Sequence, residues 1–320
     1  MTDASKDTNY IYFITNETKK HNLDNISRTN AYFAFYLKHP EIKWAFLASV
    51  VSRNAGWNMT DLVLPVFKQT LGEIENNQLF HTYEKANWLI FSDAYPQLLI
   101  YQLSTEQNEA KFHLLQYFNV SLFMIREWYL FWRKKDLTRM VYALIINEQY
   151  VIDRPIMQNN YYKKHVFLKI PYLLQNILRM NAVLLPTKQR ELYGFFVPGF
   201  TKVENRIKLG KKIFHLLFTP SIYFRVKDFC LSVPHTGSRH DYEQFSCNQL
   251  KSQTVDLRAA FPVIEHEYKQ YPDWYNQTKN VSKWLKQIEI RRYQVISKQF
   301  YRKRKLFEVY VRLKHLLQKK

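Results

Sequence analysis

The stretch from Arg28 to Leu62 reads RTNAYFAFYLKHPEIKWAFLASVVSRNAGWNMTDL, and it decides the fold that the sequence predicts. Its first part has apolar residues at spacings of three and four, which is the period of one helix face. The motif His39-Pro40-Glu41 interrupts that face, because proline suits the first turn of a helix and not its interior. We therefore expect one helix to end near His39 and another to begin at Pro40.

The second half of this stretch combines a buried apolar stripe with polar residues at helix ends. Gly56 is typical of a left-handed helix stop, and Asn58 followed by Asp61 resembles an N-terminal cap. Two interpretations stay open for the polar residues between them. They either satisfy the ends of neighbouring helices, or they form the floor of a pocket in which Arg53 faces an anion.

The remaining sequence favours an all-α fold, because the apolar spacing is helical in most segments and alternating strands are lacking. The chain has 320 residues, 47% of them hydrophobic, and only 6 glycines. We expect a single multi-helix domain with a long basic C-terminal helix. The predicted parts are a flexible N-terminal tail at 1–20, a helical core at 21–275 and a basic amphipathic helix at 276–320.

The N-terminus and the two cysteines indicate a compartment. The sequence MTDASKDTNYIYF has no basic segment followed by an apolar one, so it does not resemble a signal peptide. Cys230 and Cys247 are too few for a disulfide scaffold and fit free thiols in a reducing environment. No uncharged apolar run reaches the length of a membrane span. We expect a cytoplasmic protein without a transmembrane segment.

Positive charge is concentrated at the C-terminal end of the chain. The net charge is +20, and residues 283–320 hold 13 Lys/Arg against 2 Asp/Glu. The predicted helix there has an apolar stripe, expected to dock on the core, formed by Leu306, Tyr310, Leu313 and Leu317. Such an excess of like charge indicates an anionic partner, either nucleic acid or an acidic membrane surface. The predicted anion-binding residues are Arg53, Arg302, Lys303, Arg304 and Lys305.

One cluster of ionisable residues surrounds Gly237. Two imidazoles beside a carboxylate can act as acid and base near neutral pH, and a guanidinium can hold a phosphate or carboxylate. The candidate catalytic residues are His235, Arg239, His240 and Asp241. The alternative is an exposed polar loop whose groups bond to neighbouring helix ends.

Several enzyme classes lack their motifs in this sequence. It contains no HExxH zinc helix, no GxSxG elbow and no phosphate-binding glycine loop. We therefore assign no metal ligands and no cofactor, and the sequence alone leaves open whether the chain is an enzyme.

Four segments resemble the YppC-like family of Bacillus and its relatives. They are the opening stretch at 28–62, INEQYVIDRPIM at 146–157, GFTKVENRIKLGKKIFHLLF at 199–218 and PHTGSRHDYE at 234–243. The resemblance covers nearly the whole chain. It implies an uncharacterised cytoplasmic protein with a domain of unknown function, and it transfers no catalytic residues.

Two functional hypotheses follow. In the first, the chain binds an anionic partner through its basic C-terminal helix. In the second, it is a helical enzyme that acts on a phosphate- or carboxylate-bearing substrate in a cleft near residues 235–243. Convergence of these residues and Arg53 in one concave site would favour the enzyme.

Overall fold

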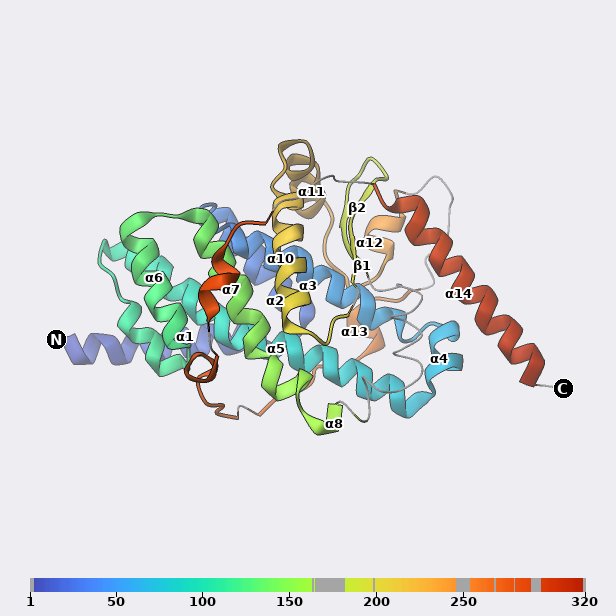
Figure 1. Ribbon diagram of the computed structural model, residues 1–320, viewed down its shortest axis with the longest axis horizontal. Coiled ribbons are helices and arrows are strands. Elements are labelled where there is room, and N and C mark those ends of the chain that lie inside the picture. The colour runs from blue at the N-terminus through green and yellow to red at the C-terminus, as the bar shows by residue number, and fades with distance from the viewer. Residues whose placement is uncertain are drawn as a thin grey trace. The chain divides into compact units, whose positions relative to one another are not determined.

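The computed structural model describes residues 3–162, 164, 182–197, 199–245, 254–267, 269–278, 280–288 and 295–318. Within these ranges the protein is mainly α-helical, with one antiparallel pair of strands (Figure 1). The predicted all-α class is confirmed. Cys247 lies outside the described residues, and Cys230 is a buried free thiol.

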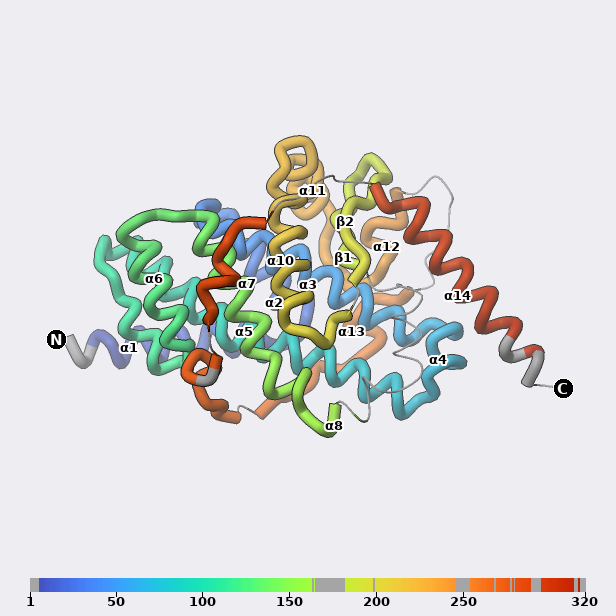
Figure 2. The backbone as a smooth tube through the Cα atoms, in the orientation of Figure 1, coloured from blue at the N-terminus to red at the C-terminus, as the bar shows by residue number. Residues whose placement is uncertain are grey.

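The chain divides into two compact units, although the sequence predicts one core at 21–275. Unit 1 consists of residues 1–49, 84–156 and 263–287, and unit 2 consists of residues 50–83, 157–262 and 288–320. Each unit is therefore assembled from three separate stretches of chain, whose path can be followed in Figure 2.

Unit 1 contains helices that are capped as their sequences require. Asp24, Ser121 and Asp136 each accept a hydrogen bond from a backbone N–H in the first turn of the helix that follows. The elements are α1 (Asp3–His21), α2 (Asn25–Lys38), the start of α3 (Lys43–Asp61), most of α5 (Glu73–Gln107), η1 (Phe112–Phe118), α6 (Leu122–Lys134), α7 (Leu137–Val151), η2 (Asp153–Met157), η4 (Trp274–Gln277) and η5 (Val281–Leu285).

Aromatic side chains fill the core of unit 1. Trp128 is fully buried, stacks on Phe112 with ring centroids 5.6 Å apart, and contacts Tyr101. Arg28 is also buried, and its guanidinium donates to both carboxylate oxygens of Glu84 at 2.5 and 2.6 Å. Arg28, the first residue of the stretch at 28–62, thus forms an ion pair in the core of unit 1.

Unit 2 combines the end of α3 with shorter helices and the strand pair. Its elements are α4 (Pro65–Leu71), the start of α5, α8 (Asn160–Tyr162), β1 (Ala182–Pro186), β2 (Leu192–Phe196), α10 (Val203–Leu217), α11 (Pro220–Ser232), α12 (His240–Glu243), α13 (Leu257–Ala260) and α14 (Ser297–Gln318). Pro65 and Pro220 occupy the first helical position of α4 and α11, where no intrahelical N–H is needed.

The hairpin of β1 and β2 is a feature that the sequence analysis missed. Leu184 pairs with Gly194 in its centre. A Cβ atom on Gly194 would lie 2.0 Å from the backbone oxygen of Val183, and its φ is +145°. Only glycine permits this close approach of the two strands.

The C-terminal helix begins later than residue 276, where we predicted its start. Residues 274–277 and 281–285 form short 3-10 helices, and α14 starts at Ser297. Just before it, the N–H of Ile296 donates to the carbonyl of Leu192 at 2.8 Å. Pairing with β2 holds this segment extended, which excludes it from a continuous helix.

Two further predictions about helix ends need correction. Residues 3–21 form helix α1, where a flexible tail was expected at 1–20. The break between α2 and α3 is present, but α3 passes through Gly56 and ends at Asp61. Asn58 therefore lies inside α3 and caps no helix, and its side-chain oxygen accepts a hydrogen bond from Arg239.

Candidate functional site

The segment from Pro234 to Glu243 packs on the last turns of α3 within unit 2. Gly237 has a φ of +78°, and a Cβ there would lie 2.6 Å from the Cβ of Leu257, so the tight turn requires glycine. The hydroxyl of Thr60 on α3 donates to the Gly237 carbonyl at 2.7 Å. The opening stretch and the candidate catalytic segment therefore touch.

Arg239 forms a buried ion pair with Asp61. Its Nε and Nη2 donate to the two carboxylate oxygens at 2.7 Å each, and its Nη1 donates to the Tyr242 hydroxyl. Arg304 of α14 donates to the same carboxylate at 3.0 and 3.3 Å. Burial by itself raises the pKa of Asp61, but the two guanidinium groups outweigh it and hold that pKa below its usual value.

His235 and Asp241 form a second buried pair beside this cluster. His235 Nδ1 lies 3.2 Å from Asp241 Oδ2, which also accepts from Trp57 Nε1 at 2.9 Å. The hydroxyl of Thr236 donates to Asp241 Oδ1 at 2.6 Å. Burial raises the pKa of Asp241, whereas these hydrogen bonds lower it further than burial raises it. The carboxylate is thus held by protein groups on both oxygens.

Arg53 is buried and points at backbone carbonyls. Its Nη1 donates to the carbonyl of Val233 at 3.0 Å, and its Nη2 donates to that of Cys230 at 3.2 Å. Both acceptors lie at the C-terminal end of α11, where helix carbonyls lack intrahelical partners. The structure therefore places Arg53 as a cap for α11.

Three of the predicted catalytic residues lie in one segment packed on α3, but their polar groups are bonded within the protein, Arg239 to Asp61 and Tyr242 and His235 to Asp241. His235, Arg239 and Asp241 are buried, and His240 alone among the four is exposed. The segment is therefore not the exposed loop of the alternative interpretation, and most of its polar groups bond to other side chains of unit 2, such as Asp61 and Trp57. A substrate would have to displace these internal bonds to reach them, and this gives the enzyme hypothesis less support.

The four predicted anion-binding residues on α14 have different surroundings. Arg302 and Lys305 are exposed, whereas Arg304 is bound to Asp61. The ammonium of Lys303 lies 3.8 Å from the centre of the Phe196 ring on β2. Two of the four predicted anion-binding residues are therefore engaged within unit 2.

Helix α14 has two apolar stripes, and the sequence analysis chose the wrong one for docking. Phe300, Phe307 and Val311 are buried, and Phe307 contacts Phe67 of α4, which α14 passes in Figure 1. The second stripe is exposed: Leu306 by 57%, Val309 by 45%, Tyr310 by 43%, Leu313 by 56% and Leu316 by 64%. The spacing of Phe300, Phe307 and Val311 is equally helical and could have identified the docking face.

The described residues form neither a metal-binding cluster nor a membrane-spanning helix. No group of three or more His, Cys, Asp or Glu side chains is arranged to hold a metal ion in those ranges. Nor is any helix there long and apolar enough to cross a membrane.

Comparison with known proteins places this helical architecture in a family. Residues 20–304 match the family described as "Protein of unknown function (DUF2515)", and the chain belongs to it. The chain is also 48% identical over 264 residues to "Uncharacterized protein YppC" of Bacillus subtilis (strain 168), which covers 82% of each protein. The YppC-like resemblance is therefore confirmed. No solved structure matches the chain.

Proposed function

We propose that this protein binds an acidic membrane surface through the exposed face of α14. The observation that carries the proposal is the exposed apolar stripe of Leu306, Val309, Tyr310, Leu313 and Leu316, each at least 43% exposed. Residues of one helix at these spacings lie on the same face. Soluble surfaces rarely expose such a contiguous apolar patch without a binding role.

The charge of α14 complements acidic lipids. The helix carries seven Lys/Arg and one acidic residue, Glu308. Arg302, Lys305 and Arg312 are exposed beside the apolar stripe. A helix that lies in a membrane interface buries an apolar face among acyl chains and sets basic residues against anionic headgroups. The proposal includes a cytoplasmic location, since the cytoplasmic leaflet is the acidic one.

Nucleic acid is the less favoured anionic partner. Phosphate contacts require cations, and bases stack on aromatic rings, but neither needs a row of exposed leucines. An acidic lipid surface binds the cations through its headgroups and the leucines through its acyl chains. We therefore treat nucleic-acid binding as an outcome that would contradict the proposal.

The test is co-sedimentation of the full chain with vesicles of phosphatidylglycerol and phosphatidylcholine in equal amounts. Truncation of α14 is unsuitable because Phe300 and Phe307 belong to the core of unit 2. The apolar variant combines Leu306→Ser, Leu313→Ser and Leu316→Ser. The charge variant combines Arg302→Gln, Lys305→Gln and Arg312→Gln. The control variant is Phe224→Ser with Leu231→Ser, which removes two exposed apolar side chains from α11 instead.

We expect the parent and the control variant to bind equally. Three lost cations should weaken binding about a hundredfold at low salt, from about 1 kcal/mol for each charge near an acidic surface. The apolar variant should bind at least roughly tenfold more weakly, because its leucines no longer leave water.

Three results would contradict the proposal. The first is an absence of vesicle binding by the parent. The second is binding of a fluorescent single-stranded oligonucleotide in lipid-free solution that the charge variant weakens and the apolar variant leaves unchanged. The third is a concentration-dependent dimer, detected by light scattering, that the apolar variant abolishes.

A further inference from the structure

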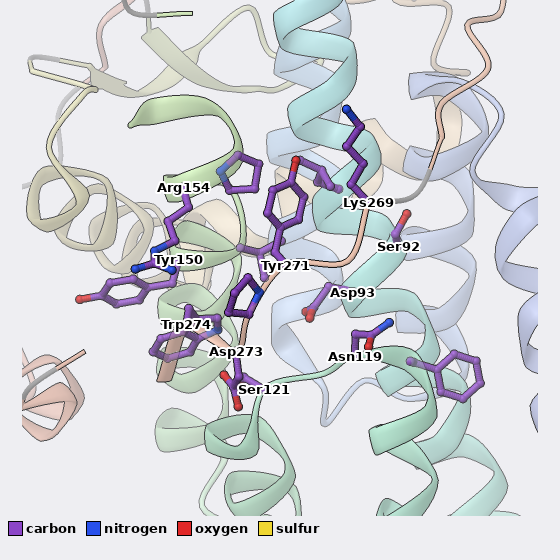
Figure 3. Close-up of a pocket in the computed structure, with 15 residues that line it drawn as sticks. Ser92, Asp93, Asn119, Ser121, Tyr150, Arg154, Lys269, Tyr271, Asp273 and Trp274 are labelled. Carbon is purple, nitrogen blue, oxygen red and sulfur yellow. The ribbon is translucent and has the colours of Figure 1, made fainter. Parts of the chain in front are cut away.

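A hollow of about 70 Å³ lies in unit 1, and none of the candidate catalytic residues is among those that line it (Figure 3). It is bounded by α5, the residues that precede α6, the end of α7 and the segment 269–274. Figure 3 shows Asp93 in the middle of the labelled residues, with Trp274 and Tyr150 on one side and Ser92 and Asn119 on the other.

Two fixed amides hold the carboxyl group of Asp93. Its Oδ2 accepts hydrogen bonds from Gln97 Nε2 and Asn147 Nδ2. The oxygen of Gln97 accepts from Trp128 Nε1 at 2.8 Å, and that of Asn147 accepts from Trp274 Nε1 at 2.9 Å. Because an indole N–H can only donate, neither amide can turn its oxygen toward Asp93. The network therefore presents Asp93 as an acceptor in a fixed orientation.

Asp93 has no cationic partner in the part of the chain that the structure describes. The donors to its Oδ2 are neutral amides, and no hydrogen bond reaches its Oδ1 from a described residue. Burial raises the pKa of this carboxyl to about 7, although the two amides lower it and Asp273 raises it further. A carboxylate in such surroundings is stabilised when a cation enters.

The walls of the hollow suit a cation. Tyr150 and Trp274 stack with ring centroids 4.5 Å apart and an interplanar angle of 7°, and Phe118 and Tyr271 also line the hollow. The negative faces of aromatic rings attract ammonium groups, more strongly where water is excluded.

The rim of the hollow is positively charged, opposite in sign to the Asp93 carboxylate. Arg154 and Lys269 line the hollow and are exposed, so they meet solvent at its mouth. A simple amine would be repelled by them on its way in. A molecule with an anionic group at its other end would instead be attracted.

We propose that this hollow binds a small molecule that carries both an ammonium and an anionic group. The ammonium group contacts Asp93 between the aromatic walls, and the anionic group faces the rim that Arg154 and Lys269 make positive. This chemistry belongs to free amino acids and to the phosphoethanolamine headgroup, and the experiment separates the two. The inference uses no residue of α14 and stands apart from the proposed membrane binding.

The test is isothermal titration calorimetry of the full chain at pH 7.5 with four probes. Glycine and phosphoethanolamine carry both charges, whereas ethanolamine and inorganic phosphate carry one each. We expect at least one of the first two to bind tenfold or more tightly than either of the others. Preference for glycine indicates an amino-acid site, and preference for phosphoethanolamine indicates a headgroup site.

Two variants test which residues contact the ammonium group of the ligand and which face its anionic group. Asp93→Asn removes the carboxylate and should weaken the preferred probe at least tenfold. Its matched control is Glu148→Gln, since Glu148 is another carboxyl of unit 1 whose pKa burial raises to about 7, and it does not line the hollow. The rim variant, Arg154→Gln with Lys269→Gln, should weaken binding of the preferred probe, whereas ethanolamine should bind no more weakly than before, because two repelling cations are gone.

The proposal fails if no probe binds, if inorganic phosphate binds as tightly as the doubly charged probes, or if Glu148→Gln weakens binding as much as Asp93→Asn. Should Asp93→Asn not fold, the rim variant decides, because both of its residues are exposed. An unchanged affinity of the preferred probe for the rim variant then overturns the proposal.

Discussion

Two buried acids, one in each unit, are held in opposite ways. In unit 2, Asp61 is bound by two guanidinium groups, from Arg239 and Arg304, and its pKa is lowered. In unit 1, Asp93 is held by neutral amides beside a hollow, and its pKa is raised to about 7. A buried charge whose partners are all supplied by the protein stabilises the fold. A buried acid without such a cation is a better candidate for a ligand site.

The largest expected effect is that of Asp61→Asn. The substitution leaves the guanidinium groups of Arg239 and Arg304 without their carboxylate, and breaking a buried pair in this way costs about 3–5 kcal/mol. Urea denaturation of the variant and the parent measures the loss. The control is Arg302→Gln, since Arg302 is exposed on the same helix. A loss below about 1 kcal/mol would show that Asp61 does not hold unit 2 together.

The second prediction concerns how the free energy of unfolding changes with pH through the carboxyl of Asp93. Burial raises the pKa of Asp93 and of Glu148 to about 7, from 3.8 and 4.5. Between those values the folded state binds more protons than the unfolded state, so the free energy of unfolding decreases as pH rises toward 7. Asp93→Asn removes the contribution of Asp93 and should be more stable than the parent at pH 8, by at most roughly 4 kcal/mol.

The same substitution should have a much smaller effect near pH 3, where Asp93 is mostly protonated in both states. Denaturation at pH 3 and pH 8 gives the two differences. Equal differences at both values would mean that the Asp93 carboxyl titrates normally, and the contrast with Asp61 would disappear.

A third prediction concerns the contact between α3 and the turn at Gly237. Thr60→Val keeps the shape of the side chain but removes the hydroxyl that donates to the Gly237 carbonyl at 2.7 Å. An unsatisfied buried acceptor costs roughly 1–3 kcal/mol, and we expect a value near the lower end. Thermal denaturation should show a lower melting temperature, with Thr70→Val on α4 as a control that removes a hydroxyl bonded only within its own helix. Equal shifts for both variants would argue against a special role for this contact.

The smallest effect should come from His240→Ala. His240 is exposed, in contrast to His235, which is 5% exposed and lies beside Asp241. Surface substitutions of this kind change stability by about 0.5 kcal/mol or less. His235→Ala, measured in the same way, should cost more because it strips Asp241 of a hydrogen bond. Equal effects would contradict the buried placement of His235.

Helical periodicity predicted the class of fold, and a proline predicted the break between α2 and α3. The hairpin was missed because β1, Ala-Val-Leu-Leu-Pro, is nearly all buried and has no alternation to recognise. The sequence left open whether the 28–62 and 235–243 stretches touch, and it did not indicate that their polar groups would be paired inside unit 2. The sequence shows which side chains can ionise, but it does not show what each of them contacts. Arg53 is buried and its guanidinium bonds to carbonyls at the end of α11, so it caps that helix.

The surroundings of Asp93 could not be predicted from the sequence. Its network joins α5, α6, α7 and the segment near Trp274, and no local spacing indicates that Gln97, Asn147 and Trp274 meet there. On α14, both apolar stripes have helical spacing, so periodicity alone could not select the docking face. Only the packing of Phe307 on Phe67 decided it.

The pairing of Ile296 with Leu192 also affects how the hairpin behaves toward other chains. A two-stranded hairpin leaves outer N–H and C=O groups that can template the addition of a further strand. Here the carbonyl of Leu192 accepts from the N–H of Ile296, and the N–H of Leu192 donates to the hydroxyl of Ser297. The start of α14 thereby blocks the outer edge of β2 at this position, and the molecule carries its own protection against edge-to-edge aggregation there.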